Sequence, residues 1–278
     1  MNPIDFTQHQ LLLAFLLTLF AGLSTGIGSA IAFFTRRTNT SFLSVSLGLS
    51  AGVMIYVSFV ELLADSFDAM KQLYGDRPGT IYSILSFFGG ILLIALIDRF
   101  VPEKSNPHEM HSVEEIDRYD PEKKRTPTNY KMLRVGLVTA AVLAIHNFPE
   151  GMVTFLSGLK DTSVAIPIAV AIAIHNVPEG ISVSVPVYYA TGNRKKAFWL
   201  SFLSGLAEPL GAVIGYLILM PFLTDATLGI IFAAIAGIMV YISLDELLPA
   251  AEEYGKHHHA IYGLIVGMVV MAVSLVFL

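Results

Sequence analysis

The chain contains no cysteine, which excludes disulfide bonds, thiolate metal sites and cysteine nucleophiles. It is also poor in charge. Only 14% of its 278 residues are charged, whereas 54% are hydrophobic, and the mean hydropathy is +0.66. A soluble globular protein of this length does not need so much apolar surface, so the composition indicates a polytopic membrane protein. The modest net charge of −5 gives no reason to expect a nucleic-acid partner.

Lys and Arg are absent from residues 1–10 as well. A cleaved signal peptide normally begins with a basic segment, so the first apolar run is expected to be a spanning helix and not a leader. Eight runs are long and apolar enough to cross a bilayer as helices. They are Leu11–Phe34, Phe42–Val60, Ile81–Ile97, Val135–Leu159, Val164–Tyr189, Ala197–Leu223, Ala226–Leu244 and Ile261–Leu278. We therefore expect an all-α fold in which residues 1–278 form one transmembrane domain.

The loops between these helices differ strongly in positive charge. All but three of the 17 lysines and arginines fall in loops on one side; the exceptions are Lys71, Arg77 and Lys160. Lys and Arg concentrate on the cytoplasmic side of membrane proteins. The pattern predicts that both termini lie outside the cytoplasm and that the polar, charge-rich segment 100–131 is a flexible cytoplasmic loop.

A hexapeptide occurs twice, in the fourth and fifth predicted helices: His-Asn-Phe-Pro-Glu-Gly at 146–151 and His-Asn-Val-Pro-Glu-Gly at 175–180. Ionisable residues at membrane depth are costly and usually functional. Residues four apart share a helix face, so His146 with Glu150, and His175 with Glu179, would point the same way. Two facing antiparallel helices would then bring two imidazoles and two carboxylates to one point. Such nitrogen and oxygen ligands suit Zn²⁺, Fe²⁺, Mn²⁺ and Co²⁺.

Three further groups could form a second, adjacent metal position that shares the two glutamates. Asn147 and Asn176 lie about 100° around the helix from the histidines. Glu208 is a third intramembrane carboxylate, and no Lys or Arg lies inside any predicted span. Pro149 and Pro178 each free the carbonyl four residues earlier, and Gly151 and Gly180 are expected to loosen each helix further.

The chain also repeats itself over longer distances. The segment Ala-Gly-Val-Met-Ile-Tyr-Val-Ser-Phe-Val-Glu-Leu-Leu at 51–63 matches Ala-Gly-Ile-Met-Val-Tyr-Ile-Ser-Leu-Asp-Glu-Leu-Leu at 236–248, and residues 22–28 resemble residues 205–211. Helices one to three therefore correspond to helices six to eight. Five spans separate each pair, so the two copies run in opposite directions around helices four and five. Inverted repeats are typical of secondary transporters, whose substrate site lies near the membrane midplane.

Some features leave two interpretations open. Glu61 and Glu246 would either lie at opposite mouths of a transport path or serve as surface anchors. Met54 and Met239 would either bind metal or only pack against neighbouring apolar side chains. Segment 100–131 and the run His257, His258 and His259 would collect metal or simply be solvated.

Eight spans, a histidine-containing loop after the third, and the paired hexapeptide resemble the ZIP family of metal transporters, most closely its bacterial zinc transporters. The resemblance covers essentially the whole chain. It implies uptake of divalent metals into the cytoplasm across the plasma (inner) membrane through a two-metal site. The metal ligands it implies are His146, Asn147, Glu150, His175, Asn176, Glu179 and Glu208.

We therefore expect a metal importer, not an enzyme. Its substrates would be Zn²⁺ and also Fe²⁺, Mn²⁺ and Co²⁺, it would need no catalytic cofactor, and its partners would be these ions and the lipid bilayer. A homodimer is left open. The alternatives are an intramembrane zinc-dependent hydrolase, which would need a separate general base, and a haem protein using His146 and His175 as axial ligands. The chain has no His-Glu-x-x-His, and the glutamate near each histidine argues against haem.

Overall fold

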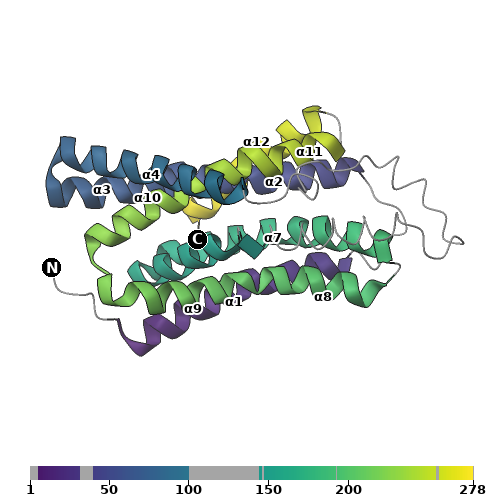
Figure 1. Ribbon diagram of the computed structural model, residues 1–278, viewed down its shortest axis with the longest axis horizontal. Coiled ribbons are helices and arrows are strands. Elements are labelled where there is room, and N and C mark those ends of the chain that lie inside the picture. Colours follow the sequence, from purple (N-terminus) through teal and green to yellow (C-terminus); the bar gives the residue numbers. More distant parts are fainter. Residues whose placement is uncertain are drawn as a thin grey trace, which may run out of the picture.

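A computed structural model describes residues 6–31, 40–99, 144–145, 147–191, 193–254 and 257–277 (Figure 1), and its regular elements are all helices. A further helix, at residues 147–160, contains all but the first residue of the first hexapeptide. Two five-residue π-helical segments, Ser58–Leu62 and Ser243–Leu247, and one 3₁₀ turn, Met220–Phe222, interrupt the longer helices. The α-helices are α1 (Gln8–Ile31), α2 (Thr40–Val57), α3 (Leu63–Tyr74), α4 (Asp76–Asp98), α7 (Thr162–Thr191), α8 (Arg194–Gly205), α9 (Ala207–Leu219), α10 (Asp225–Ile242), α11 (Leu248–Tyr254) and α12 (His257–Phe277).

Seven helical stretches within the described residues are long and apolar enough to cross a membrane. Many of their large apolar side chains face outward; Leu85, Leu217 and Val276 are 64%, 66% and 75% exposed. Such surfaces suit lipid and not water. The prediction of an all-helical, multi-pass membrane protein is confirmed. Most of the first half of the predicted span Val135–Leu159 lies outside the described residues, and so does segment 100–131.

The helices pack as two bundles (Figure 1). In the first, here the α1 bundle, α1 contacts α7, α8 and α9, and the helix at 147–160 packs on α9 through Phe155 and Tyr216, whose ring centroids lie 5.5 Å apart. In the second, the α2 bundle, α2 contacts α11 and α12 while α10 contacts α3 and α4. Helix α7 contacts both α2 and α12, so it joins the two bundles.

Two predicted helices end too early in the sequence interpretation. The second was predicted to stop near Val60 and the seventh near Leu244, each just before an acidic residue. In the structure both continue, through the π-helical segments, into α3 and α11. A helix accepts acidic residues where they reach the surface, and Glu61 and Glu246 are both partly exposed. Gly75, with φ 86°, then makes the turn from α3 into α4.

The sixth predicted helix is also not continuous. The chain turns at Leu206, so Ala197–Leu223 forms α8, α9 and the 3₁₀ turn. Pro209 accounts for the break, because proline has no N–H to donate to the carbonyl of Gly205. Glu208 therefore stands in the first turn of α9, buried, directly after this break.

Glycines of both hexapeptides sit at close helix contacts. A Cβ on Gly151 would overlap the backbone of Glu208, and one on Gly180 would overlap the carbonyl of Thr25. In return, Gly28 faces the carbonyl of Val177 and Gly211 that of Phe148. The expectation that these glycines loosen their helices is wrong for α7, which runs unbroken through Pro178 and Gly180. Their small size instead lets neighbouring backbones approach.

Candidate metal site

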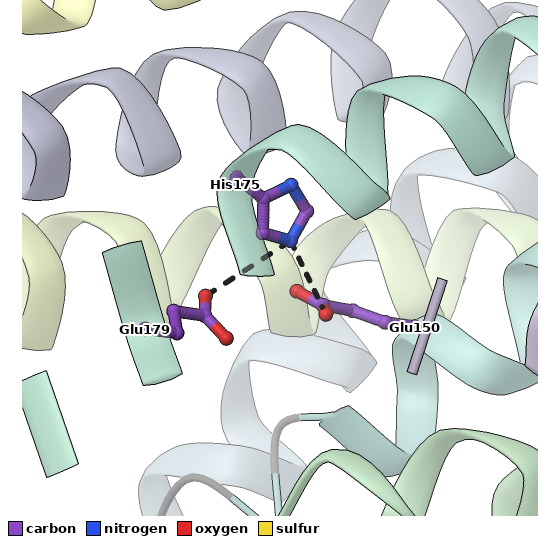
Figure 2. Close-up of side chains that lie close together, drawn as sticks. All are labelled: Glu150, His175 and Glu179. Carbon is purple, nitrogen blue, oxygen red and sulfur yellow. Dashed lines mark hydrogen bonds and ion pairs between the residues drawn. The ribbon is translucent and has the colours of Figure 1, made fainter. Parts of the chain in front are cut away.

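Three of the predicted ligands meet between the helix at 147–160 and α7 (Figure 2). Nε2 of His175 lies 3.3 Å from Oε2 of Glu150 and 3.9 Å from Oε1 of Glu179. One ligand atom from each residue lies within 4.8 Å of the others, and all three side chains are fully buried. His175 and Glu179 meet because they are one helical turn apart, whereas Glu150 is brought by packing of the first hexapeptide's helix.

A second polar set adjoins this cluster. The side-chain amide of Asn176 donates to the backbone carbonyl of Ala21 at 2.8 Å and, at short range, to Oε1 of Glu208. The amide of Asn147 donates to the carbonyl of Ser204 at 3.3 Å. Asn147, Asn176 and Glu208 are all fully buried. The structure therefore brings Asn176 and Glu208 together, as the sequence predicts, and each asparagine also donates a hydrogen bond to a backbone carbonyl.

Several acceptor oxygens in this region lack a hydrogen-bond donor within the described part of the chain. They are Oε1 of Glu150, Oδ1 of Asn176 and Oε2 of Glu208. A buried acceptor without a partner costs about 1–3 kcal/mol, and more if it is charged. The helices that carry them are the helix at 147–160, α7 and α9, and the only Lys or Arg in them is Lys160, at the end of the first, where it pairs with Asp65. A divalent cation would satisfy these oxygens, so the donor set fits a metal ion.

His146, the remaining predicted ligand, lies outside the described residues. Met54 and Met239 are fully buried members of the hydrophobic core, which favours the packing interpretation. His258 stacks on Tyr262 at the start of α12, with ring centroids 6.0 Å apart.

One residue at the cluster was not singled out in the sequence. The hydroxyl of Ser50, in α2, donates to Oε1 of Glu179 at 3.1 Å, and Ser50 is fully buried. Helix α2 also carries buried serines at 44 and 46, so residue type and helical position do not distinguish Ser50 from them. Only the packing of α2 on α7 shows the difference.

A cavity of about 290 Å³ lies beside α3, at the end of the bundles where the helix at 147–160 ends and α1 and α10 begin. Asp65, Lys160 and Asp225 are among its lining residues. Nζ of Lys160 lies 2.6 Å from Oδ2 of Asp65, so this ion pair joins the α1 bundle to the α2 bundle. Glu61 lies one helical turn before Asp65 and is partly exposed.

Comparison with known proteins identifies relatives of this chain. Residues 99–275 match the family model described as ZIP zinc transporter. A zinc transporter ZupT from Clostridium perfringens is 60% identical over 275 residues, covering 96% of each chain. One from Streptococcus mutans is 61% identical over 269 residues, covering 97% of this chain and 98% of the relative.

A third, from Oceanobacillus iheyensis, is 60% identical over 272 residues, covering 98% of this chain and all of the relative. All three relatives carry the name of a transporter, which confirms the expectation that the chain is no enzyme. With a family model that spans more than half of the sequence and relatives that align over nearly all of it, this chain belongs to the ZIP family of zinc transporters.

Proposed function

We propose that this protein imports Zn²⁺ across the plasma membrane into the cytoplasm through the buried site between the helix at 147–160 and α7. The observation that carries the proposal is the cluster of Glu150, His175 and Glu179, whose ligand atoms lie within 4.8 Å of one another in a membrane-spanning bundle. A metal transporter needs such a cluster. The names of the relatives support zinc as the substrate.

The site is proposed to hold two adjacent ions. One would be bound by His146, Glu150, His175 and Glu179, and the other by Asn147, Asn176 and Glu208 with the two shared glutamates. Support comes from the free oxygens of Glu150, Asn176 and Glu208, which are spread over both positions. Imidazole, amide and carboxylate ligands are not selective among first-row divalent ions, so Fe²⁺, Mn²⁺ and Co²⁺ are proposed as further substrates.

We further propose eight spans in one domain of residues 1–278, with helices one to three repeated in inverted form as six to eight. Two pairs of contacts support the repeat. Gly22 and Gly205 face each other's carbonyl oxygens, each 2.6 Å from the point that a Cβ would occupy. Gly52 of α2 packs on Leu264 of α12, as Gly237 of α10 packs on Phe87 of α4.

The two π-helical segments add to this support. Ser58–Leu62 and Ser243–Leu247 occupy equivalent places in the two copies. In each, the first serine donates to the carbonyl four residues earlier, Met54 at 2.6 Å and Met239 at 2.7 Å. The same local distortion in both copies is expected if they share one ancestral fold.

The direction of transport follows from the charge pattern. The membrane side that holds Lys71, Arg77 and Lys160 is proposed to face out, which makes the cavity beside Asp65 and Lys160 an outer vestibule. Both termini would lie outside and segment 100–131 inside the cytoplasm. Homodimer formation stays a prediction.

An uptake assay in proteoliposomes tests the proposal. Parent protein should take up Zn²⁺, and Glu150→Ala or Glu179→Ala should reduce uptake to near background, because each removes a carboxylate that faces the ion. Asp161→Asn, at an exposed helix end, is the matched acidic control and should transport normally. Competition with Fe²⁺, Mn²⁺ and Co²⁺ in the same assay ranks the metals. Parent-like uptake by both glutamate variants would refute the site.

A further inference from the structure

Ser50 makes a contact that the metal site itself does not explain. Its hydroxyl donates to Oε1 of Glu179 at 3.1 Å, and that same oxygen lies 3.9 Å from Nε2 of His175. The serine therefore holds the oxygen that faces the ligand cluster. Both residues are fully buried, so water does not screen the contact.

The neighbouring buried serines of this span behave differently. Ser44 donates to the carbonyl of Ala251 at 2.6 Å, and Ser58 donates to that of Met54 at 2.6 Å. Their hydroxyls satisfy backbone groups, whereas Ser50 reaches a carboxylate on another helix. Because α2 and α7 belong to different bundles, Ser50 acts on Glu179 from outside the bundle that carries the ligands.

We infer that Ser50 is a positioning residue for Glu179, an inference that rests on the proposed function of the cluster. A hydroxyl has one hydrogen to donate, and donating it to Oε1 fixes the rotation of the carboxylate. A carboxylate has about four lone-pair sites on its two oxygens, so Glu179 can bind a metal ion and still accept this hydrogen bond. Ser50 therefore need not leave the contact when metal arrives.

The effect of Ser50 should fall on affinity and not on maximal rate. Without the hydroxyl, Glu179 samples other rotamers, and each binding event must fix it again. Loss of a hydrogen bond to a metal-binding carboxylate typically weakens metal affinity or activity about 10- to 100-fold. Ser50 is not itself a ligand, so a bound ion has the same ligands in the variant as in the parent. The transport step itself should therefore be little changed.

The test measures Zn²⁺ binding to purified full-length protein and uptake in proteoliposomes. Ser50→Ala should weaken binding about tenfold or more and raise KM by the same factor, with the maximal rate within about twofold of the parent. Ser50→Thr retains the hydroxyl and should restore most of the affinity. Ser44→Ala makes the same change at a buried serine of the same helix and should leave Zn²⁺ affinity unchanged.

Two results would overturn the inference. One is parent-like affinity in Ser50→Ala; the other is an equal loss of affinity and maximal rate accompanied by a lower thermal midpoint, which would indicate a packing role. Glu179→Ala, measured in parallel, separates this failure from failure of the proposed function. If Glu179→Ala loses Zn²⁺ while Ser50→Ala behaves as the parent, only the role of Ser50 is refuted. If Glu179→Ala binds and transports normally, the site assignment itself is wrong.

Discussion

Several buried side chains of this protein carry an acceptor oxygen that receives no hydrogen bond from the described residues. Glu208 illustrates the point, because Oε1 accepts from Asn176 while Oε2 has no donor among the described residues. A carboxylate kept half-satisfied at full burial is destabilising unless something else binds it. A bound metal ion would pair with this carboxylate and remove the unfavourable burial energy. The residues that destabilise the metal-free protein are therefore the ones expected to bind its substrate.

Glu208→Gln tests this assignment by stoichiometry. The variant keeps the size of the side chain but removes the only carboxylate that the proposed second metal position would not share with the first. We expect the number of Zn²⁺ ions bound at saturation to fall from two toward one, and transport to slow without stopping. Elemental analysis of equilibrated, purified protein gives the count. Equal stoichiometry and affinity in parent and variant would remove Glu208 from the site.

Asp161, at the start of α7, allows a pH prediction outside the membrane-spanning segments. It accepts hydrogen bonds from the hydroxyl of Ser163 at 2.7 Å and from its backbone N–H at 2.8 Å, and these bonds lower the pKa of the carboxyl below its usual value. A lowered folded-state pKa means that Asp161 contributes stability above its unfolded pKa and loses it as pH falls through the folded value.

Asp161→Ala should therefore cost about 1 kcal/mol near neutral pH, the usual value of a helix cap. The cost should shrink in acid, where the parent carboxyl is protonated too. Asp161→Asn keeps a capping oxygen and should be nearly neutral. Unfolding curves in detergent at neutral and acidic pH measure these differences, and a pH-independent cost for the alanine variant would contradict the capping account.

At the scale of whole helices, contacts through glycine decide how the site is assembled. Gly28 brings α1 against the carbonyl of Val177, two residues beyond His175, and Gly151 brings the helix at 147–160 against Glu208. The polar groups of three helices reach one another because these backbones nearly touch. Larger residues at these points would separate the ligands even if each helix stayed intact.

A pair of Gly→Ala variants distinguishes packing from helix propensity. At Gly89, in α4, an added Cβ meets nothing within 4 Å, so Gly89→Ala should stabilise by about 0.5–1 kcal/mol. At Gly28 the same change meets backbone, and overpacking should cost about 1–3 kcal/mol and weaken Zn²⁺ binding. Thermal midpoints of both variants in detergent provide the check. Similar shifts in the two would show that the close contact is unimportant.

For the whole molecule, orientation in the membrane is the property most open to test. The chain has no cysteine, so single cysteines can be introduced without background. An impermeant thiol reagent applied to intact cells should label Lys160→Cys and spare Asn193→Cys, because the proposed topology puts them on opposite sides. Lys160 is in a surface ion pair with Asp65, whose loss costs no more than about 1 kcal/mol. The reverse labelling pattern would invert the proposed direction of import.

The sequence by itself determined what depends on local pattern. Apolar runs predicted the membrane helices, one-turn spacing put His175 and Glu179 on one face, and the duplicated hexapeptide pointed to the proposed ligands. Each of these properties is carried by residues close together in the chain. Only the tertiary structure decided what depends on contacts between distant segments. It showed the approach of Glu150 to His175, the pairing of Asn176 with Glu208, and the contact of Ser50 with Glu179. It also showed that glycines expected to loosen helices serve to pack them. These features arise when separate helices meet, and in a membrane helix many registers satisfy the same apolar pattern, so only packing selects one.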